Sequence, residues 1–465
     1  MSAQTAFRSS TTESTGRDPE PPEVLDPGPT PLRRIYRFEL VKLLTQWRLR
    51  FVLLACWLVP GAVVAVVGQQ SSLPSDTVFG RWLGQSGWAG PLVVLSFCCS
   101  WVLPLLTSLV AGDVFAVEDR LNTWRHLLVA VRSTRRIFAA KTAASLTLLV
   151  VLVAGMAVSA SVGGVLGIGN RPLVGLGGQQ LSPGSAAGLV VLAWATMLAP
   201  MLAFAAVGLL GSVTFGRSPV GLLLPVVLAF VLDLAQLLPL PVAVRLSLPS
   251  WSLLAWRGLF SDHIQTPAVL LGVVVDLVWA VVVIALAYLV FRRRDFTDAA
   301  YDGAGRRVLL LTVTPLVVLT SVTVVALVPF APTNSGIDRA KLETALATTY
   351  AQLYRLQTAE LHRPAVTEQQ LAASASCDKG GGLVDDVGPG NDWRCTVSWH
   401  LPDTAAVGTA IYQLDVTPDG RFVADGDGPQ SVNGFFQLHL PTGDAPNPLW
   451  QFDGTVDLLT TTPKG

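Results

Sequence analysis

The sequence predicts a mainly α-helical, polytopic membrane protein that ends in a small α+β domain. Composition is the first reason: 51% of the 465 residues are hydrophobic and 14% are charged, whereas an average soluble chain has about 25% charged residues. The second reason is a series of about seven apolar stretches, each long enough to form a membrane-spanning helix. The net charge of zero, from 32 basic and 32 acidic residues, gives no indication of a nucleic-acid partner.

A polar arm precedes an amphipathic helix. Residues 1–31 contain many prolines and little apolar surface, so we expect a disordered cytoplasmic arm. Over residues 32–50, apolar side chains recur at helical spacing, while Arg and Lys occupy the other side. This pattern favours a helix that lies on the membrane surface. The alternative is an ordinary helix of a globular protein.

Seven stretches have the length and apolar content of membrane-spanning helices. Crossing about 30 Å of hydrocarbon takes about 20 apolar residues, because only a helix satisfies its own backbone hydrogen bonds there. We therefore predict a transmembrane domain over residues 51–330, with helices at 51–68, 91–111, 142–167, 186–215, 220–240, 268–291 and 308–330.

The distribution of Arg and Lys predicts the orientation. Six basic residues over 33–50 precede the first stretch, six lie between the second and third, Arg217 lies between the fourth and fifth, and five lie between the sixth and seventh. The alternate connections hold one or two each. Basic connections stay on the cytoplasmic side. We expect a multi-pass protein of a bacterial plasma membrane, with its N-terminus in the cytoplasm and its C-terminal segment outside. The excess of Arg over Lys points to a GC-rich bacterial genome.

The C-terminal segment, residues 331–465, is soluble in character, with eight basic and sixteen acidic residues. We predict a helix over 337–356 and a second short helix with a capping box at Thr367 and Gln370. Strands are predicted at 393–401, 410–416 and 421–424, the last two joined by a turn at 418–420. Together these elements predict an extracytoplasmic α+β domain.

Two of the five cysteines lie in this domain. In an oxidising compartment Cys377 and Cys395 would form a disulfide, which we predict, the alternative being two free thiols. Cys56, Cys98 and Cys99 lie in apolar stretches, where we interpret them as small packing residues.

A charged segment, residues 112–141, joins the second and third apolar stretches. Its apolar residues follow three-four spacing, so one face of a helix would be apolar and the other charged. Such a helix, held between two spans, can transmit a push from a soluble partner into the membrane. The alternative is a surface helix that only fixes topology.

Several patterns resemble one membrane-protein family. They are the entry helix with Phe38-Glu39-Leu40 and Lys42, the acidic-then-basic segment with Glu118, Thr123-Trp124-Arg125, Leu127-Leu128, Arg132-Ser133 and Lys141, and the Trp-bearing segment 241–266, which is similar to an external re-entrant hairpin. The chain resembles an ABC-2 type permease, the membrane subunit of ATP-binding-cassette exporters, of an actinobacterial kind. The resemblance covers about 32–292; beyond it the chain departs, with a seventh span and an added domain.

The resemblance implies a separate ATPase dimer and a second permease half, identical or different. It also implies a docking surface for the ATPase, carried here by Glu39, Lys42, Asp113, Glu118, Asp119, Arg120, Trp124, Arg125, Arg132, Arg135, Arg136 and Lys141. No phosphate-binding loop of the type G-x-x-x-x-G-K-[ST] occurs in the chain. We therefore expect no cofactor here, and ATP with Mg²⁺ on the partner.

Catalytic and metal-binding signatures are missing, so we expect neither an enzyme nor a metal site. Asp415 and Asp419 match part of a calcium loop, but a hairpin turn fits better. Asp233 and Asp276 lie within apolar stretches, where an acidic side chain is costly. They are interpreted either as a polar lining or proton site, or as structural groups paired with hydroxyls or with Arg245 and Arg257.

The alternative function is a non-transporting membrane sensor or assembly anchor, whose external domain binds a ligand or an envelope partner. The seventh stretch and the added domain favour it.

Overall fold

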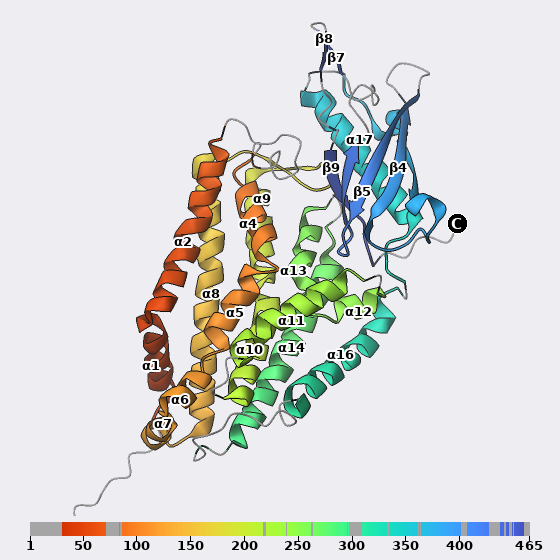
Figure 1. Ribbon diagram of the computed structural model, residues 1–465. Coiled ribbons are helices and arrows are strands. Elements are labelled where there is room, and N and C mark those ends of the chain that lie inside the picture. Colours follow the sequence, from red (N-terminus) through yellow and green to blue (C-terminus); the bar gives the residue numbers. More distant parts are fainter. Residues whose placement is uncertain are drawn as a thin grey trace, which may run out of the picture.

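A helical bundle carries a small sheet domain at one end (Figure 1). The computed structural model describes residues 30–70, 83, 86–216, 220–238, 240–261, 264–294, 296, 309–332, 334–360, 362, 364–400, 407–426, 438–440, 443–445, 449 and 451–459. The predicted disordered arm, 1–31, lies outside this part of the chain except for Thr30 and Pro31.

The described part of every predicted span is helical. The helices are α2 (Trp47–Gly68), α4 (Ala89–Cys98) with α5 (Val102–Ala111), α8 (Thr134–Gly167), α9 (Pro183–Thr196) with α10 (Leu198–Phe215), α11 (Val220–Gln236), α14 (Thr266–Arg292), and η2 (Leu309–Val313) with α16 (Thr314–Leu327) and η3 (Val328–Phe330). Membrane-helix character is thus confirmed.

Fewer than seven of the described helices are long and apolar enough to cross a membrane. Five described helices can cross a membrane, and the α4–α5 pair, bent by 64°, would make a sixth. The remaining predicted span, 220–240, is α11, whose 17 residues extend about 25 Å at 1.5 Å per residue, short of about 30 Å of hydrocarbon. The count of seven is therefore not confirmed.

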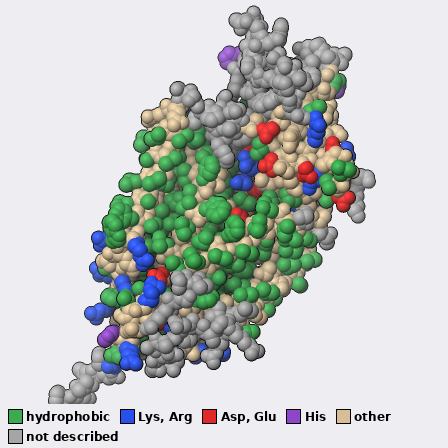
Figure 2. Space-filling model, viewed as in Figure 1, with side chains coloured by type: hydrophobic (Ala, Val, Ile, Leu, Met, Phe, Trp, Pro, Cys, Tyr) green, Lys and Arg blue, Asp and Glu red, His purple; other side chains and the backbone are tan. Residues whose placement is uncertain are grey.

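Small residues let the long helices approach closely. Where α2 crosses α8, a Cβ atom added to Gly163 would lie 2.2 Å from the carbonyl oxygen of Gly61. Where α10 crosses α11, a Cβ on Gly221 would lie 2.7 Å from the carbonyl oxygen of Gly211. Such contacts are typical of helices packed in lipid, where dispersion contacts replace the hydrophobic driving force. Apolar side chains cover the face of the bundle that Figure 2 shows, as a lipid-facing surface requires.

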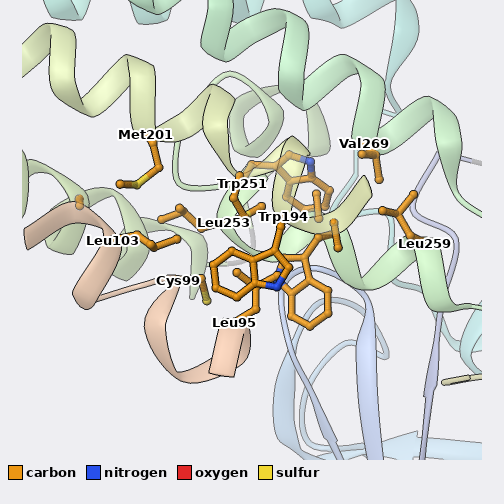
Figure 3. Packing of buried hydrophobic residues seen from close by; sticks show 14 of the residues in the cluster. Leu95, Cys99, Leu103, Trp194, Met201, Trp251, Leu253, Leu259 and Val269 are labelled. Carbon is orange, nitrogen blue, oxygen red and sulfur yellow. The ribbon is translucent and has the colours of Figure 1, made fainter. Parts of the chain in front are cut away.

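The bend between α4 and α5 lies inside the bundle. Leu95, Cys99 and Leu103 on either side of the bend pack beside Trp194 of α9 (Figure 3). Next to them lies the segment that follows α11, which forms three short helices: α12 (Val242–Leu246), α13 (Ser252–Ala255) and η1 (Trp256–Phe260). This segment corresponds to the predicted re-entrant-like region, 241–266, and is held against α14 by contacts of α13 and η1.

Three shorter helices lie at the end of the bundle opposite the sheet domain (Figure 1). They are α1 (Leu32–Thr45), α6 (Ala116–Leu121) and α7 (Trp124–Val131). The predicted helix 32–50 is broken at Gln46, whose backbone is extended. The charged segment, 112–141, contains α6, α7 and the start of α8 rather than one helix, because Asn122 and Arg132 adopt left-handed conformations with φ of 52° and 56°. We call this end the basic end and these three helices the platform.

The C-terminal domain packs one long helix on a sheet. The sheet has the antiparallel order β3-β4-β5-β6-β9, and its inward side chains, such as Trp399 and Tyr412, contact Tyr350 of the helix. The elements are α17 (Arg339–Glu360), α18 (Glu368–Leu371), β3 (Ser374–Lys379), η4 (Gly380–Gly382), β4 (Gly390–His400), β5 (Val407–Val416), β6 (Arg421–Gly426) and β9 (Gln451–Thr455).

Two small hairpins lie outside this sheet. They are β1 (Leu173–Val174) with β2 (Gln180–Leu181), between α8 and α9, and β7 (Leu438–Leu440) with β8 (Gly443–Ala445).

Local predictions in this domain are confirmed. The capping box at Thr367 and Gln370 begins α18. Cys377 and Cys395 are opposite each other in the β3–β4 ladder, with Cα atoms 4.0 Å apart, and form the predicted disulfide. The β5–β6 connection is a tight turn in which the Thr417 hydroxyl donates to Asp419 and Gly420 has a φ of 84°.

Candidate functional site

A buried lysine joins two platform helices to the bundle. Lys141, in the first part of α8, is 1% exposed. Its Nζ atom lies 3.0 Å from Oε2 of Glu39 in α1 and 2.7 Å from Oε1 of Glu118 in α6. Lys42 of α1 also donates to Oε1 of Glu118. Two cations and two carboxylates therefore neutralise one another, with Lys42 partly exposed and the other three groups buried. The helices α1, α6 and α8 meet at this point.

The environment of Glu118 favours its charged form. Burial opposes ionisation, but the Lys141 ammonium and the hydrogen bonds from Lys141, Lys42 and Thr123 outweigh burial and lower the pKa to about 2. The second oxygen of Glu118 accepts the Thr123 hydroxyl, which lies between α6 and α7. Glu118 thus holds the turn between the two helices as well as their contact with α8.

A second buried ion pair joins the platform to α14. Arg294, just after α14, places Nη1 2.9 Å from Oδ2 of Asp119, and the indole of Trp124 donates to Oδ1 of the same carboxylate over 2.7 Å. Asp119 is 7% exposed and Trp124 is 5% exposed. The end of α14 is therefore bonded to the turn between α6 and α7.

Neutral contacts complete this attachment. The hydroxyl of Ser212, buried in α10, accepts the backbone N–H groups of Phe115 and Ala116 at 3.0 Å each, which satisfies two donors at the start of α6. An aromatic cluster surrounds Phe115, with Trp124, Phe138 and Phe291 in ring contact with it. These residues come from the platform, α8 and α14, so the platform is continuous with three helices of the bundle.

The predicted docking residues differ in exposure and fall into three groups. Glu39, Glu118, Asp119, Trp124 and Lys141 are buried and cannot touch a soluble partner directly. Lys42, Asp113 and Arg136 are partly covered, and Arg120, Arg125, Arg132 and Arg135 are exposed. Arg120 forms an ion pair of 2.6 Å with Asp113. The basic side chains gather at this end of the surface (Figure 2). A partner would therefore meet the arginines, while the buried group supports them from within.

Sequence patterns alone missed several members of this site. Arg294 was counted only as a topology signal, although it is the partner of Asp119. Ser212 lies in an apolar stretch that also holds Thr196 and Thr214, so the sequence does not single it out. The aromatic residues Phe115, Phe138 and Phe291 are far apart in the chain, so their cluster had no local signature.

A second set of polar contacts joins the bundle to the C-terminal domain. Arg245 of α12 is fully buried and donates to the carbonyl oxygens of Pro418 and Ser335. Burial lowers the pKa of Arg245 to about 10, against the opposing effect of Asp419, so the guanidinium stays charged at neutral pH. In addition, Val242 N–H donates to the carbonyl oxygen of Asn334 over 3.0 Å.

Arg257 in η1 forms an ion pair between the bundle and the C-terminal domain. Its Nη1 atom lies 3.1 Å from Oδ2 of Asp419, in the β5–β6 turn. Asp233 of α11 is also an electrostatic neighbour of Arg257, and its carboxylate interacts with the Ser100 hydroxyl in the bend between α4 and α5. Arg257 therefore stands between one acidic residue of the bundle and one of the domain.

Asp276 lies in the interior of α14 and is fully buried. The Ser252 hydroxyl of α13 interacts with the carboxylate, but neither oxygen has a partner with hydrogen-bond geometry among the described residues. The two predicted intramembrane acids are thus separate: Asp233 neighbours Ser100 and Arg257, and Asp276 neighbours Ser252.

Within the residues that the structure describes, no group of three His, Cys, Asp or Glu side chains could hold a metal ion. No protein-family model matches the chain, and no curated protein matches it either.

The low pKa of Glu118 predicts a loss of stability in acid. A carboxyl group that titrates near 2 in the folded protein, against an ordinary value of 4.5, stabilises the fold above about pH 4.5 and loses that contribution as the pH falls toward 2. We expect the free energy of unfolding in mixed micelles to fall across this window, and to fall less in Glu118→Gln. Equal slopes in both proteins would contradict the assignment.

If the Arg257–Asp419 ion pair holds the C-terminal domain against the bundle, removing it should increase local opening of the β5–β6 turn. Asp419→Asn should weaken this hydrogen bond to a charged group, which is worth about 1.5–3 kcal/mol. Hydrogen exchange of the β5–β6 turn should then be about tenfold faster or more. Asp415→Asn, an exposed position on β5, is the control and should leave exchange unchanged. Equal exchange in the two variants would show that the pair does not hold the domain.

Proposed function

We propose that this chain is the membrane-spanning subunit of an ABC-2 type exporter, driven by ATP that a separate protein hydrolyses at the basic end. The observation that carries the proposal is the platform, whose helices α1, α6 and α7 present arginines to solvent. Buried ion pairs bond α1 and α6 to α8 and to the residue after α14, and the Trp124 indole bonds α7 to Asp119 of α6. A surface helix fastened in this way can pass a displacement to the bundle.

The path of such a displacement follows the contacts. Movement of α7 pulls Trp124, which is bonded to Asp119, and through Asp119 it reaches Arg294 at the end of α14. Movement of α6 pulls Glu118 and so Lys141 of α8. Separating a buried ion pair costs about 3–5 kcal/mol. The platform and the adjoining ends of α8 and α14 therefore move together.

The proposed orientation places the basic end in the cytoplasm and the C-terminal domain outside. Basic connections favour the cytoplasmic side, and the Cys377–Cys395 disulfide fits an oxidising compartment. In this arrangement the ATPase, with its ATP and Mg²⁺, binds the platform, and a second permease half packs beside the bundle. The bent α4–α5 pair and α11 then count as spans beside the five long helices, which gives seven.

A second candidate function, a membrane sensor or anchor, is favoured by one observation. The C-terminal domain is bonded to the bundle by the buried Arg245 and by Arg257 rather than tethered by a linker alone. A ligand or envelope partner that binds this domain would act on α12 and η1 directly.

The test replaces exposed charges of the basic end, Arg125 in α7 and Arg135 at the start of α8, and leaves the buried charges intact. We expect the wild-type protein, purified gently from its own membranes, to retain a P-loop ATPase in native mass spectra, and Arg125→Glu with Arg135→Glu to lose it. Arg355→Glu with Arg394→Glu, two exposed arginines of the C-terminal domain, is the matched control and should retain the ATPase.

Two results would contradict the proposal. One is a wild-type preparation without an ATPase, and in that case an envelope protein retained through the C-terminal domain would favour the sensor or anchor. The other is an ATPase that remains bound to the Arg125→Glu, Arg135→Glu variant as tightly as to the control.

A further inference from the structure

A groove runs between α17 and the free edge of the sheet in the C-terminal domain. The sheet begins at β3, which pairs with β4 on one side only. Beside its other edge lies a groove of about 510 Å³. Its lining includes Ala340, Thr344, Ala347 and Thr348 of α17 and Ala375 of β3.

The register shows which backbone groups of β3 point into this groove. The N–H of Cys377 donates to Oε1 of Glu343 on α17 over 2.8 Å, so it points away from β4. Lys379 N–H likewise donates away from β4, to Asp386. Because hydrogen-bonded and non-hydrogen-bonded positions alternate along an antiparallel strand, Ala375 also directs its N–H and C=O outward. Within the described residues no hydrogen bond reaches the Ala375 N–H.

The helical wall of the groove carries small side chains around one acidic residue, Glu343. The hydroxyls of Thr344 and Thr348 donate to the carbonyl oxygens of Ala340 and Thr344, so they are satisfied by their own helix. The opposite face of α17, with Leu342 and Leu346, is buried in the core. Small side chains on the exposed face leave room for a second chain beside β3.

The charged residues of the groove define the partner further. Among the described residues that line it, Glu343 and Glu368 are the charged ones. Glu343 is paired with Arg339 over 2.8 Å. Glu368 is half exposed and paired with Arg355 at the surface, and a surface pair of this kind contributes only about 0–1 kcal/mol, so it exchanges partners readily. The disulfide joins β3 to β4 two residues from Ala375, so the edge is held in place before anything binds.

We propose that this groove binds an extended polypeptide segment that adds a strand to β3, with small side chains toward α17 and a basic side chain toward Glu368. Main-chain hydrogen bonds to Ala375 supply the pairing, and alternate side chains supply the selectivity. The proposal does not depend on an ATPase at the basic end. It assigns the C-terminal domain a protein partner, bound as an unfolded or terminal segment.

The test uses the full chain in nanodiscs and a randomised peptide library displayed on phage. Peptides selected on the wild-type protein are synthesised and their affinities compared between variants. Ala375→Pro removes only the outward N–H donor, a change that edge strands tolerate. Thr344→Trp fills the groove from α17, and Ala359→Trp, an exposed position of the same helix outside the groove, is the matched control.

We expect peptides with small residues at alternate positions and at least one basic residue. Their affinity should fall about tenfold or more in Ala375→Pro and in Thr344→Trp, and stay within about twofold in the control. The proposal is overturned if no peptide is enriched, or if the peptides bind both groove variants as tightly as the control. Self-association of the wild-type protein that Ala375→Pro abolishes would also overturn it, because a second copy would then be the occupant.

Discussion

The ammonium group of Lys141 determines how the basic end of the bundle is built. A charged side chain at the edge of an apolar bundle is stable only when opposite charges replace its water. Its two carboxylate partners come from different helices, Glu39 from α1 and Glu118 from α6. Satisfying one buried charge therefore positions two surface helices. The exposed arginines on these helices are therefore held in defined positions as well, and together they form the surface of the platform.

The same constraint operates at the other end of the molecule. Arg245 is buried between the bundle and the C-terminal domain, and its two terminal guanidinium nitrogens donate to carbonyl oxygens of the domain. The segment of short helices that carries Arg245 and Arg257 also packs against α14, the helix whose other end meets the platform through Arg294. One helix thus contacts both attachment points, so α14 is the direct physical connection between the proposed ATPase surface and the domain.

Apolar length and periodicity predicted the helices well because hydrocarbon leaves a chain few alternatives to a helix. They could not predict that Glu39 and Glu118 turn inward, since periodicity places charged side chains on the outer face by default. The break at Asn122 depends on one left-handed residue, and the burial of Asp119 depends on Arg294, 175 residues away. The disulfide was predictable because compartment and cysteine count left few alternatives, whereas the groove beside β3 required the register of the sheet.

The most direct test of the account is the free energy of unfolding of Lys141→Met in mixed micelles, compared with Lys141→Met combined with Glu39→Gln and Glu118→Gln. The single variant leaves two buried carboxylates with too few cations and should be less stable than wild type by about 3–5 kcal/mol. The triple variant removes the uncompensated charges and should recover most of that loss. A single variant as stable as wild type would show that the buried network does not hold the platform.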